Sequence, residues 1–350
     1  MEEDLPQLEL NATRHFTNWM AAQQVSLMFT TYEAGKLFSL GLQSDGRLSV
    51  FERTMPRCMG MFASADAKTV YYSTLYQIWR MEQVNRQEKS YQGYDGVYLP
   101  QSCTVTGDVD AHDIVVSDSG DVYFVNTLLS CVAKTSDEFS FEPFWKPPFI
   151  SRLAAEDRCH LNGLALRDGV PRYVTSVSQT DVNSGWRENR RDGGVVVDMS
   201  NEEVIADGLS MPHSPRWYDD KLWLLNSGKG EVGFVDVGTG QFEPIAFCPG
   251  YARGMALVGD YAVVGLSEPR ENKAFNGLEL QGLLADKKVS PRCGLQIVNL
   301  RTGDVEHSLE ISGVVSELYD VVALPGVVRP MTIGFKSDEI QHVLSIGGQG

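Results

Sequence analysis

The sequence lacks several features that would place it in a familiar class of protein. Among its 350 residues there is no run of about 18 apolar residues, so no membrane-spanning helix is expected. Basic residues are scarce, with 30 Lys and Arg against 46 Asp and Glu, and the net charge of −16 argues against binding to nucleic-acid phosphates. The acidic start, MEEDLPQLEL, has no basic and apolar secretory signal. We expect a cytoplasmic protein without a membrane or nucleic-acid partner.

Cysteine is also uncommon, and its spacing indicates neither a structural zinc site nor a disulfide framework. The chain has no CxxC pair, and its six cysteines are Cys58, Cys103, Cys131, Cys159, Cys248 and Cys293. None has the spacing of a zinc finger. An even number of cysteines would allow disulfides, but a chain of this size without a secretory signal favours buried free thiols.

Helical periodicity is nearly absent, and β-strand signals take its place. Short runs rich in Val, Tyr, Trp and Leu, each bounded by turn residues, occupy 69–81, 120–134, 171–177, 221–227 and 261–267. Only residues 5–25 and 277–287 have the pattern of short helices. The 33 glycines suit a protein with many tight turns, because glycine adopts positive φ without strain.

A weak repeat organises these strands. Each unit has a polar residue, a small residue, three apolar residues, an acidic turn and a second strand. The first residues of the six units are Met59, His112, Asn162, His213, Arg253 and Asp320. The units therefore begin 40 to 67 residues apart, which is close to the period of propeller blades.

We therefore predict an all-β, single-domain, six-bladed β-propeller over residues 26–336. Residues 26–40 have no unit of their own and are expected to supply outer strands to the last blade, which would close the ring. Residues 1–25 would form a partly helical extension, and residues 337–350 a C-terminal tail. A pair of β-sandwiches is the alternative fold.

The first strand of each propeller blade lines the central channel, so the unit starts and the residues two positions earlier are expected to face it. These pairs are Arg57 with Met59, Asp110 with His112, His160 with Asn162, Met211 with His213, Tyr251 with Arg253, and Leu318 with Asp320. Three of the six histidines of the chain fall at these positions.

Three neutral imidazoles that meet on one axis can bind a divalent transition metal. We predict that His112, His160 and His213 hold Zn, Fe, Cu or Mn. The carboxylates expected beside this metal are Asp110, Glu317 and Asp320. In the alternative, each imidazole bonds to neighbouring backbone and fills the channel.

Arginines on the same lining predict an anion site. The guanidinium groups of Arg57 and Arg253 can grip a carboxylate, sulfate or phosphate in bidentate fashion. The alternative is a structural ion pair with Asp110 or Asp320.

Further substrate contacts are expected from an aromatic loop and from two lining residues. Trp186 and Arg187 belong to a loop long enough to reach the channel mouth, where loops commonly carry function. A solvated loop is the alternative. Asn162 and Tyr251 are the lining residues that we expect to bind substrate.

Nucleophilic catalysis is not supported by the sequence. Ser214 and Cys159 each adjoin a histidine, but neighbours in a strand point to opposite faces. The chain also has no GxSxG motif.

Seven segments carry a family resemblance. They are TTYEAGKL (30–37), TGDVDAHD (106–113), the stretch 146–175 with DRCHLNGLA, GWREN (185–189), GLSMPHSPRW (208–217), PGYARGMA (249–256) and SELYDVVALPG (316–326). They resemble an uncharacterised bacterial family, a conserved hypothetical group with a domain of unknown function. The resemblance implies a propeller, in some members joined to or encoded with tetratricopeptide or sulfotransferase-like modules, and no assigned reaction.

The residues that these motifs mark as functional coincide with the predicted channel lining. They are His112, His160, Asn162, Trp186, Arg187, His213, Arg253 and Glu317. Asp113 departs from the family pattern, which favours Glu after the histidine, and this weakens any role for that carboxylate.

Together these features predict a metal-dependent enzyme that acts on a small anionic or peptide-like substrate in the central channel. Glu317 or Asp110 would serve as general base, while Arg253 and Arg57 would orient an anionic group. Hydrolysis, elimination and oxygen chemistry all remain open. The alternative is a non-catalytic ligand-binding or scaffold propeller, and the sequence does not indicate an oligomeric state.

Overall fold

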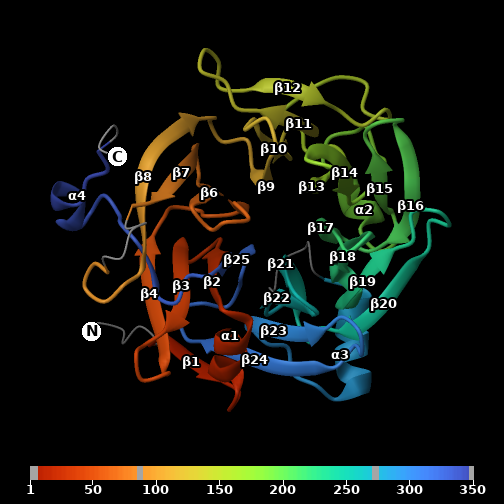
Figure 1. Cartoon of the computed structure of the whole chain (residues 1–350). Helices are drawn as coiled ribbons and strands as arrows, with labels where there is room; N and C mark the ends of the chain where they lie inside the picture. The colour runs from red at the N-terminus through yellow and green to blue at the C-terminus, as the bar shows by residue number, and fades with distance from the viewer. Residues whose placement is uncertain (1–6, 85–89, 270–275, 347–350) are drawn as a thin grey trace, which may run out of the picture.

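The chain forms six β-sheets around a central axis (Figure 1). The structure, a computed structural model, describes residues 7–84, 90–269 and 276–346. Each sheet has at least four strands, and its innermost strand begins at or close to a unit start predicted from the repeat. The predicted six-bladed propeller is confirmed, and the β-sandwich alternative is excluded.

The first three blades contain the following strands. Blade 1 is built from β25 (Val321–Pro325), β2 (Val25–Thr31), β3 (Lys36–Leu42) and β4 (Leu48–Thr54). Blade 2 is built from β5 (Met61–Ala63), β6 (Thr69–Ser73), β7 (Gln77–Gln83) and β8 (Gly96–Val105). Blade 3 is built from β9 (Ala111–Val116), β10 (Val122–Asn126), β11 (Cys131–Lys134) and β12 (Glu142–Trp145).

The other three blades follow in chain order. Blade 4 is built from β13 (Leu161–Arg167), β14 (Val170–Ser176), β15 (Gly194–Asp198) and β16 (Glu203–Leu209). Blade 5 is built from β17 (Pro212–Tyr218), β18 (Lys221–Asn226), β19 (Glu231–Val235) and β20 (Phe242–Phe247). Blade 6 is built from β21 (Tyr251–Val258), β22 (Tyr261–Ser267), β23 (Gly294–Asn299) and β24 (Val305–Ser312).

Both ends of the chain fasten the ring. β25 pairs antiparallel with β2, with Val321 opposite Phe29, so the inner strand of blade 1 comes from the C-terminal part of the chain and its outer strands from the N-terminal part. This confirms the predicted closure. In addition, β1 (Glu9–Ala12) extends blade 6 at β24, and β26 (Pro330–Thr332) pairs in parallel with β8 of blade 2.

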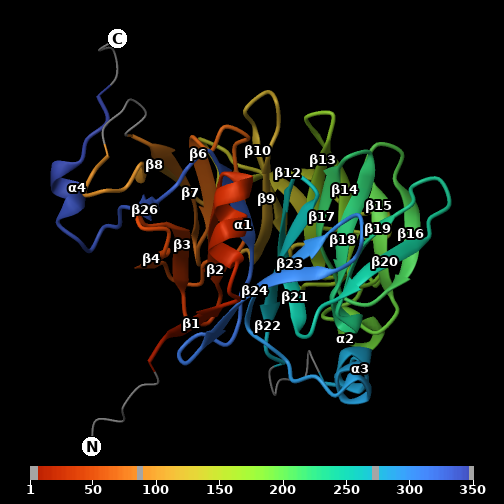
Figure 2. The same cartoon turned by 60° about the horizontal axis from the view of Figure 1, so that its bottom comes forward.

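The helices are short and lie outside the blades (Figure 2). α1 (Phe16–Gln23) occupies only part of the predicted helix 5–25, because Glu9–Ala12 is a strand; residues 5 and 6 of that segment lie outside the described residues. α3 (Glu279–Lys287) lies within the predicted helix 277–287. Within the described residues, the remaining helices are α2 (Trp186–Asn189), α4 (Glu339–His342) and a 3-10 turn at Ser227–Lys229.

The C-terminal tail predicted from residue 337 includes α4, and residues 347–350 lie outside the described part of the chain. Within the described residues no helix is both long and apolar enough to cross a membrane. All six cysteines are free thiols, as the sequence favoured, and Cys103 is the exposed one.

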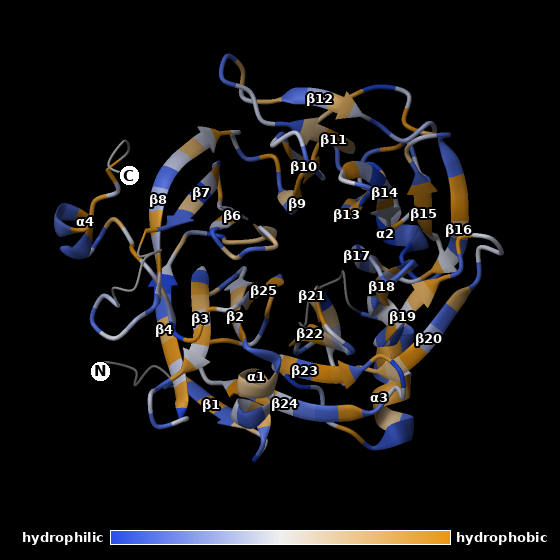
Figure 3. Cartoon of the chain, in the orientation of Figure 1, coloured by the Kyte–Doolittle hydropathy of each residue, from blue (hydrophilic) through white to orange (hydrophobic). Residues whose placement is uncertain are grey.

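The hydrophobic core lies between the faces of neighbouring blades. One cluster, for example, joins Val125 and Val132 of blade 3 to Leu164, Val174 and Val195 of blade 4. The outermost strands, such as β16, carry both hydrophilic and hydrophobic residues (Figure 3), and β16 buries only Ala206 and Leu209. The packing of one blade on the next therefore sets the geometry of the channel.

A ring of hydroxyl groups also links neighbouring blades. At the end of the second strand in five blades, a Ser or Thr donates a hydrogen bond of 2.6–3.0 Å to a carbonyl just before or at the start of the next blade's inner strand. The donors are Thr30, Ser73, Thr127, Ser227 and Ser267, and their acceptors are the carbonyls of Met59, Ala111, Leu161, Ala252 and Leu318. Between blades 4 and 5, the side-chain amide of Asn162 makes the corresponding hydrogen bond and donates to the Pro212 carbonyl at 3.0 Å.

We expect Thr127→Val to lower the free energy of unfolding by about 1–3 kcal/mol, because it leaves the buried Leu161 carbonyl without this donor. Urea denaturation measures this change. Thr104→Val is the matched control: Thr104 lies on β8, is half-buried and makes no side-chain hydrogen bond to any residue that the structure describes. It should change the unfolding free energy by less than about 0.5 kcal/mol. Equal losses in the two variants would contradict the role of the hydroxyl ring.

Candidate functional site at the histidine end of the channel

In four blades, a residue close to the start of the innermost strand has a left-handed backbone conformation. Arg57, Asp110, His160 and Met211 have φ of 49°, 56°, 53° and 50°, each two positions before a unit start. This conformation costs a non-glycine residue about 1 kcal/mol or more, and such strain often gathers at functional sites. Because the turn interrupts the extended chain, the strand alternation used to place these residues from the sequence does not apply to them.

The turn aims backbone carbonyls at two of the histidines. The His112 Nδ1 lies 2.8 Å from the carbonyl of Asp110, and the His213 Nδ1 lies 2.8 Å from the carbonyl of Met211. A carbonyl can only accept, so Nδ1 carries the proton in both rings. Nε2 is then left as a bare lone pair.

The tautomer of His213 has a second constraint. The Ser227 hydroxyl donates to the carbonyl of Ala252 at 2.6 Å and lies 3.1 Å from His213 Nδ1, so the hydroxyl oxygen accepts from the imidazole. His213 is 4% exposed, and its Nε2 has no hydrogen-bond partner within the described residues. An unpartnered buried acceptor costs about 1–3 kcal/mol, so this atom is suited to a ligand.

His160 is held by a carboxylate and an indole. Asp157 accepts from the His160 Nδ1 at 2.9 Å and from the Trp186 Nε1 at 2.8 Å. The Trp186 ring stacks on the imidazole with ring centres 4.1 Å apart. Although burial would raise the pKa of Asp157, the hydrogen bonds and the charge of His160 hold it below its usual value.

The position of Trp186 is set by two short helices, α2, which contains it, and α3, which packs against it. Trp186 begins α2 and packs with Met211, Tyr251 and, from α3, Leu280 and Leu284. The guanidinium of exposed Arg187 lies 4.5 Å from the Trp186 ring centre. The predicted reach of this loop to the site is therefore seen for Trp186, with Arg187 at its outer side.

Ring contacts join six residues into one group, here called the channel-mouth cluster: His160, His112, Tyr319, Arg253, Tyr251 and His213. His112 contacts His160 at 5.1 Å and Tyr319 at 5.6 Å between ring centres. The Arg253 guanidinium lies 5.0 Å from the Tyr251 ring and 5.1 Å from the Tyr319 ring, and Tyr251 contacts His213 at 5.6 Å. Blades 1, 3, 4, 5 and 6 contribute to the cluster, which therefore surrounds the channel axis.

The cluster keeps the imidazoles of His112 and His213 neutral. Burial, with the charges of His160 and Arg253, lowers the pKa of His112 to about 4, against the opposing charge of Asp110. Burial and the charge of Arg253 hold the pKa of His213 well below its usual value. Burial also raises the pKa of Tyr319 well above its usual range, so its hydroxyl keeps its proton. At neutral pH, the Arg253 guanidinium is therefore a cation close to two neutral imidazoles and a neutral phenol.

Two predicted site carboxylates are bound to other groups. Asp110 forms an ion pair with Arg57 at 2.9 Å, and Asp108 takes the same guanidinium at 2.7 Å. Of the two readings of Arg57, the structure therefore shows the ion pair. Glu317 is 2% exposed, accepts from the backbone N–H of Glu33 and acts on Arg253 by its charge.

The remaining lining residues lie deeper in the channel or between blades. The Asp320 carboxylate accepts from the backbone N–H groups of Met61 and Val321 at 2.8 and 2.9 Å and lies 3.6 Å from Arg216. Asp320 therefore lies beside Arg216, and the prediction that it lies beside the three histidines is wrong. Asn162 bridges blades 4 and 5 through its amide nitrogen, and its buried Oδ1 has no partner within the described residues.

The metal prediction has mixed support. All three histidines have Nδ1 bound to an acceptor, which is the usual arrangement in histidines that bind metal through Nε2. However, no group of three or more His, Cys, Asp or Glu among the described residues is placed to hold a metal ion. The Zn, Fe, Cu or Mn centre remains a prediction.

Three members of the site were not found from the sequence alone. Asp157 precedes His160 by three residues in DRCH, Tyr319 lies in SELYD, and Ser227 ends a strand as other hydroxyl residues do. The first two fall within segments that carried the family resemblance, so polar and aromatic residues adjoining a lining position were the available signal. Their contacts depend on how loops from different blades meet.

Comparisons with known proteins agree with the fold. The model of a family described as a domain of unknown function (DUF4915) matches residues 14–333. No curated protein matches the sequence. A chain of a nidogen/laminin complex is 12% identical with a TM-score of 0.53, over 86% of this chain and 99% of that one. A gluconolactonase from Xanthomonas campestris is 11% identical with a TM-score of 0.50, over 91% and 88%.

Virginiamycin B lyase from Staphylococcus aureus is also similar, at 11% identity and a TM-score of 0.40, over 87% of this chain and 99% of that one. At these identities the first two structures support the propeller fold alone, and the lyase adds no argument because its TM-score is below 0.5.

We expect the free energy of unfolding to fall as the pH drops from about 6.5 to 4, partly because of His112. Its pKa is lowered from 6.5 to about 4 in the folded chain, so in this window the unfolded chain binds a proton that the folded chain does not. The full effect is about 3 kcal/mol. His112→Gln should reduce this slope in urea denaturation at several pH values, whereas His342→Gln, on exposed α4, should leave it unchanged. An unchanged slope in His112→Gln would contradict a neutral buried imidazole.

Proposed function

The chain belongs to the DUF4915 family, and we propose that it is an enzyme that binds a small anionic substrate at the channel-mouth cluster and moves a proton there. The observation that carries the proposal is a buried cation beside unprotonated imidazoles, one of which has a bare and unpartnered Nε2. A cluster that served only to fill the channel would gain nothing from this orphaned acceptor.

Arg253 is the group that we propose binds the anion. Its guanidinium is held between the rings of Tyr251 and Tyr319, and Glu317 acts on it by charge. Such a fixed, planar donor suits a carboxylate, a sulfate or a phosphate. Arg57 is paired with two aspartates, Asp108 and Asp110, so we propose that it contributes less to anion binding.

His213 is the group that we propose accepts the proton. Its Nδ1–H is fixed by Met211 and Ser227, which leaves Nε2 as the basic atom. In the free protein the charge of Arg253 opposes protonation of this ring. A bound anion offsets that charge, so the imidazole becomes a stronger base when substrate is present. Hydrolysis and elimination both use such a base, acting on water or on a substrate carbon.

This assignment differs from the general bases predicted from the sequence. Asp110 is engaged by Arg57, and Glu317 by a backbone N–H and by the charge of Arg253. We therefore propose that Glu317 positions Arg253, and that Asp110 positions His112 through its carbonyl. Tyr319, with its protonated hydroxyl unpartnered within the described residues, is placed to donate a hydrogen bond to substrate.

Metal dependence is a second candidate, favoured by the fixed tautomers. A metal at the channel mouth would be bound by Nε2 of His112, His160 and His213, and it would supply Lewis-acid chemistry. The 5.1 Å between the centres of the His112 and His160 rings is compatible with two imidazoles on one ion, whose ring centres would lie about 5 Å apart for Zn–N bonds near 2 Å. The acid–base roles given above do not use the metal.

Anion binding is tested by calorimetric titration with acetate, succinate, sulfate and phosphate. We expect at least one of them to bind, and Arg253→Gln to weaken that affinity about tenfold or more, because a charged hydrogen bond contributes about 1.5–3 kcal/mol. Arg301→Gln is the matched control, since Arg301 is exposed and pairs with Asp260 at the rim. Equal weakening in both variants would refute a specific site, as would no binding of any of these anions.

Turnover separates an enzyme from the non-catalytic alternative. Small lactones and esters that carry a carboxylate, sulfate or phosphate group, together with 2-hydroxy acids, are incubated with the protein and followed by proton NMR. We expect conversion of a compound that also binds, and a loss of about 100-fold in rate in His213→Gln, the usual size of a general-base contribution. If His213→Gln retains the full rate, the proposed base is wrong. Binding without turnover of any compound would instead favour a ligand-binding propeller.

Metal content is measured directly by element-resolved mass spectrometry on protein purified without chelators. A resident metal should reach about half an equivalent or more and should be lost in the folded triple variant His112→Ala, His160→Ala, His213→Ala. Circular dichroism confirms that the variant is folded. Less than about 0.1 equivalent in the unsubstituted protein, or equal metal in the variant, would count against the metal candidate.

A further inference from the structure

The channel has a cavity at the end opposite the channel-mouth cluster. It has a volume of about 280 Å³, and all six innermost strands contribute to it. The two sites lie at opposite ends because the strands run through both: in β17, His213 belongs to the cluster and residues 216–218 to the cavity. In β21, likewise, Arg253 belongs to the cluster and Met255 lines the cavity.

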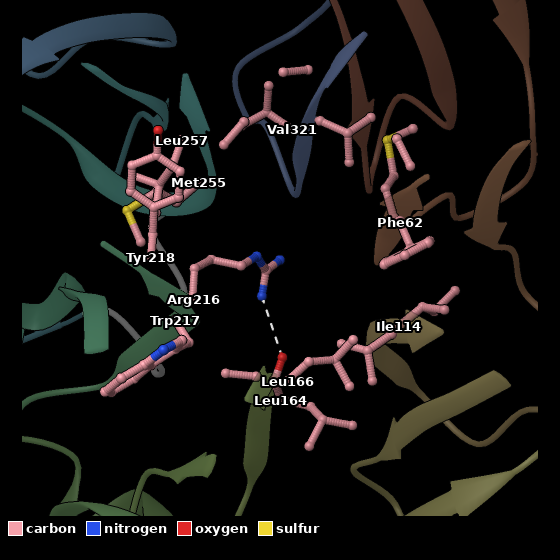
Figure 4. A pocket seen from close by; sticks show the side chains of 17 residues that line it. Phe62, Ile114, Leu164, Leu166, Arg216, Trp217, Tyr218, Met255, Leu257 and Val321 are labelled. Atoms are coloured by element: carbon pink, nitrogen blue, oxygen red, sulfur yellow. Dashed lines mark hydrogen bonds between the residues drawn. The ribbon is translucent and has the colours of Figure 1, made fainter. Parts of the chain in front are cut away.

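The walls of this cavity are apolar apart from one group. Of the described residues that line it, Arg216 alone is charged, and the others include Phe62, Leu166, Trp217 and Met255. Figure 4 shows the Arg216 side chain reaching from β17 toward the middle of the cavity, with its hydrogen bond to the Leu164 carbonyl. A guanidinium in an apolar enclosure must have its donors satisfied or be available to a ligand.

Arg216 uses only part of its donor set. Its Nη1 donates to Asp113 at 2.8 Å, to the Pro215 carbonyl at 2.9 Å and to the Leu164 carbonyl at 3.5 Å, and its Nη2 donates to Asp113 at 3.2 Å. The Nε–H has no acceptor among the described residues, and the nearest oxygen of Asp320 is 3.6 Å from Nη2. The side chain is 22% exposed although it lies inside the channel. Its Nε edge is thus open to a ligand.

The charges around the Nε–H of Arg216 determine whether the polar group of a ligand can be charged. Asp113 already neutralises Arg216 with a two-point ion pair, and the buried Asp320 lies behind the same guanidinium. Burial raises the pKa of Asp320, and the charge of Asp113 acts in the same direction against that of Arg216. A third carboxylate here would meet repulsion from the two already present. An uncharged oxygen can accept from Nε–H without that cost.

We propose that this cavity is a second ligand site, for a small, uncharged and largely apolar molecule with one carbonyl-type oxygen that accepts a hydrogen bond from Arg216. The volume is near the lower limit of ligand pockets and equals that of about nine water molecules, so the ligand has on the order of ten non-hydrogen atoms. The site is separate from the proposed anion site and does not depend on its activity.

Four compounds of one shape test the proposal: benzamide, benzoate, benzylammonium and ethylbenzene. Binding is followed by NMR titration, and the place of binding by NOEs from the aromatic protons to the methyl groups of Met61 and Met255, which line the cavity. We expect benzamide to bind with Kd in the millimolar range or tighter, as its size permits. Ethylbenzene should bind about tenfold more weakly, because it lacks the acceptor for Arg216. Benzoate and benzylammonium should bind more weakly than benzamide.

Two variants and a control complete the test. Ala323→Phe should fill the cavity and abolish the NOEs, and Leu257→Trp does the same from another blade if Ala323→Phe does not fold. Ala22→Phe places the same added ring on exposed α1 and should leave binding unchanged. Tighter binding of benzoate than of benzamide, equal binding of ethylbenzene, or no NOE to either methionine would each overturn the proposal.

Discussion

The buried group formed by Arg216, Asp113 and Asp320 holds the centre of the propeller together. Asp113, in blade 3, accepts from the backbone N–H of Leu164 in blade 4 at 3.1 Å, and Asp320, entering blade 1, accepts from Met61 in blade 2 at 2.8 Å. Arg216 of blade 5 binds Asp113 and faces Asp320. Two carboxylates cannot lie this close in a buried channel without a cation, so the five blades are tied to one another by a requirement for charge balance. Both ends of the channel are built on this group, with the imidazoles on one side and the apolar cavity on the other.

The sequence predicted the parts of the structure that depend on a repeat. Because each blade repeats one pattern, residues such as His112 and His213 could be placed at the channel before any contact was known, and the missing unit at residues 26–40 indicated how the ring closes. The partner of each side chain could not be predicted in this way, because the repeat shows which blade a residue belongs to but not which side chains lie beside it. Arg57 finds Asp108 and Asp110 rather than a ligand, and Asp320 finds Arg216 rather than the histidines. The left-handed turns at Arg57, His160 and Met211 were also missed, since these residue types carry no signal for positive φ.

Each end of the channel has an arginine, Arg253 at one and Arg216 at the other, although the chain as a whole is strongly acidic. The surroundings of the two guanidinium groups differ. At the histidine end, the Arg253 guanidinium lies between the rings of Tyr251 and Tyr319, close to the neutral imidazoles of His112 and His213, and this is the group proposed to bind an anion. At the other end, a guanidinium is neutralised by carboxylates, and the apolar walls favour uncharged molecules. Net charge therefore says little about either site, because the acidic surplus lies largely in exposed turns such as Asp219 and Asp220. Burial and pairing of single arginines decide what each end can bind.

The closure of blade 1 by β25 has a consequence for how the protein is made. A ribosome releases β2, β3 and β4 first, but their inner partner β25 emerges only after the other five blades. Until then the edge of β2, a strand whose seven residues are all buried in the finished fold, has no neighbour on the channel side. Unpaired apolar edges attract other chains, so the nascent protein passes through a stage at which it is prone to aggregate. A truncation before Val321 would prolong that stage indefinitely, even though it removes only one strand from each of two sheets, β25 and β26.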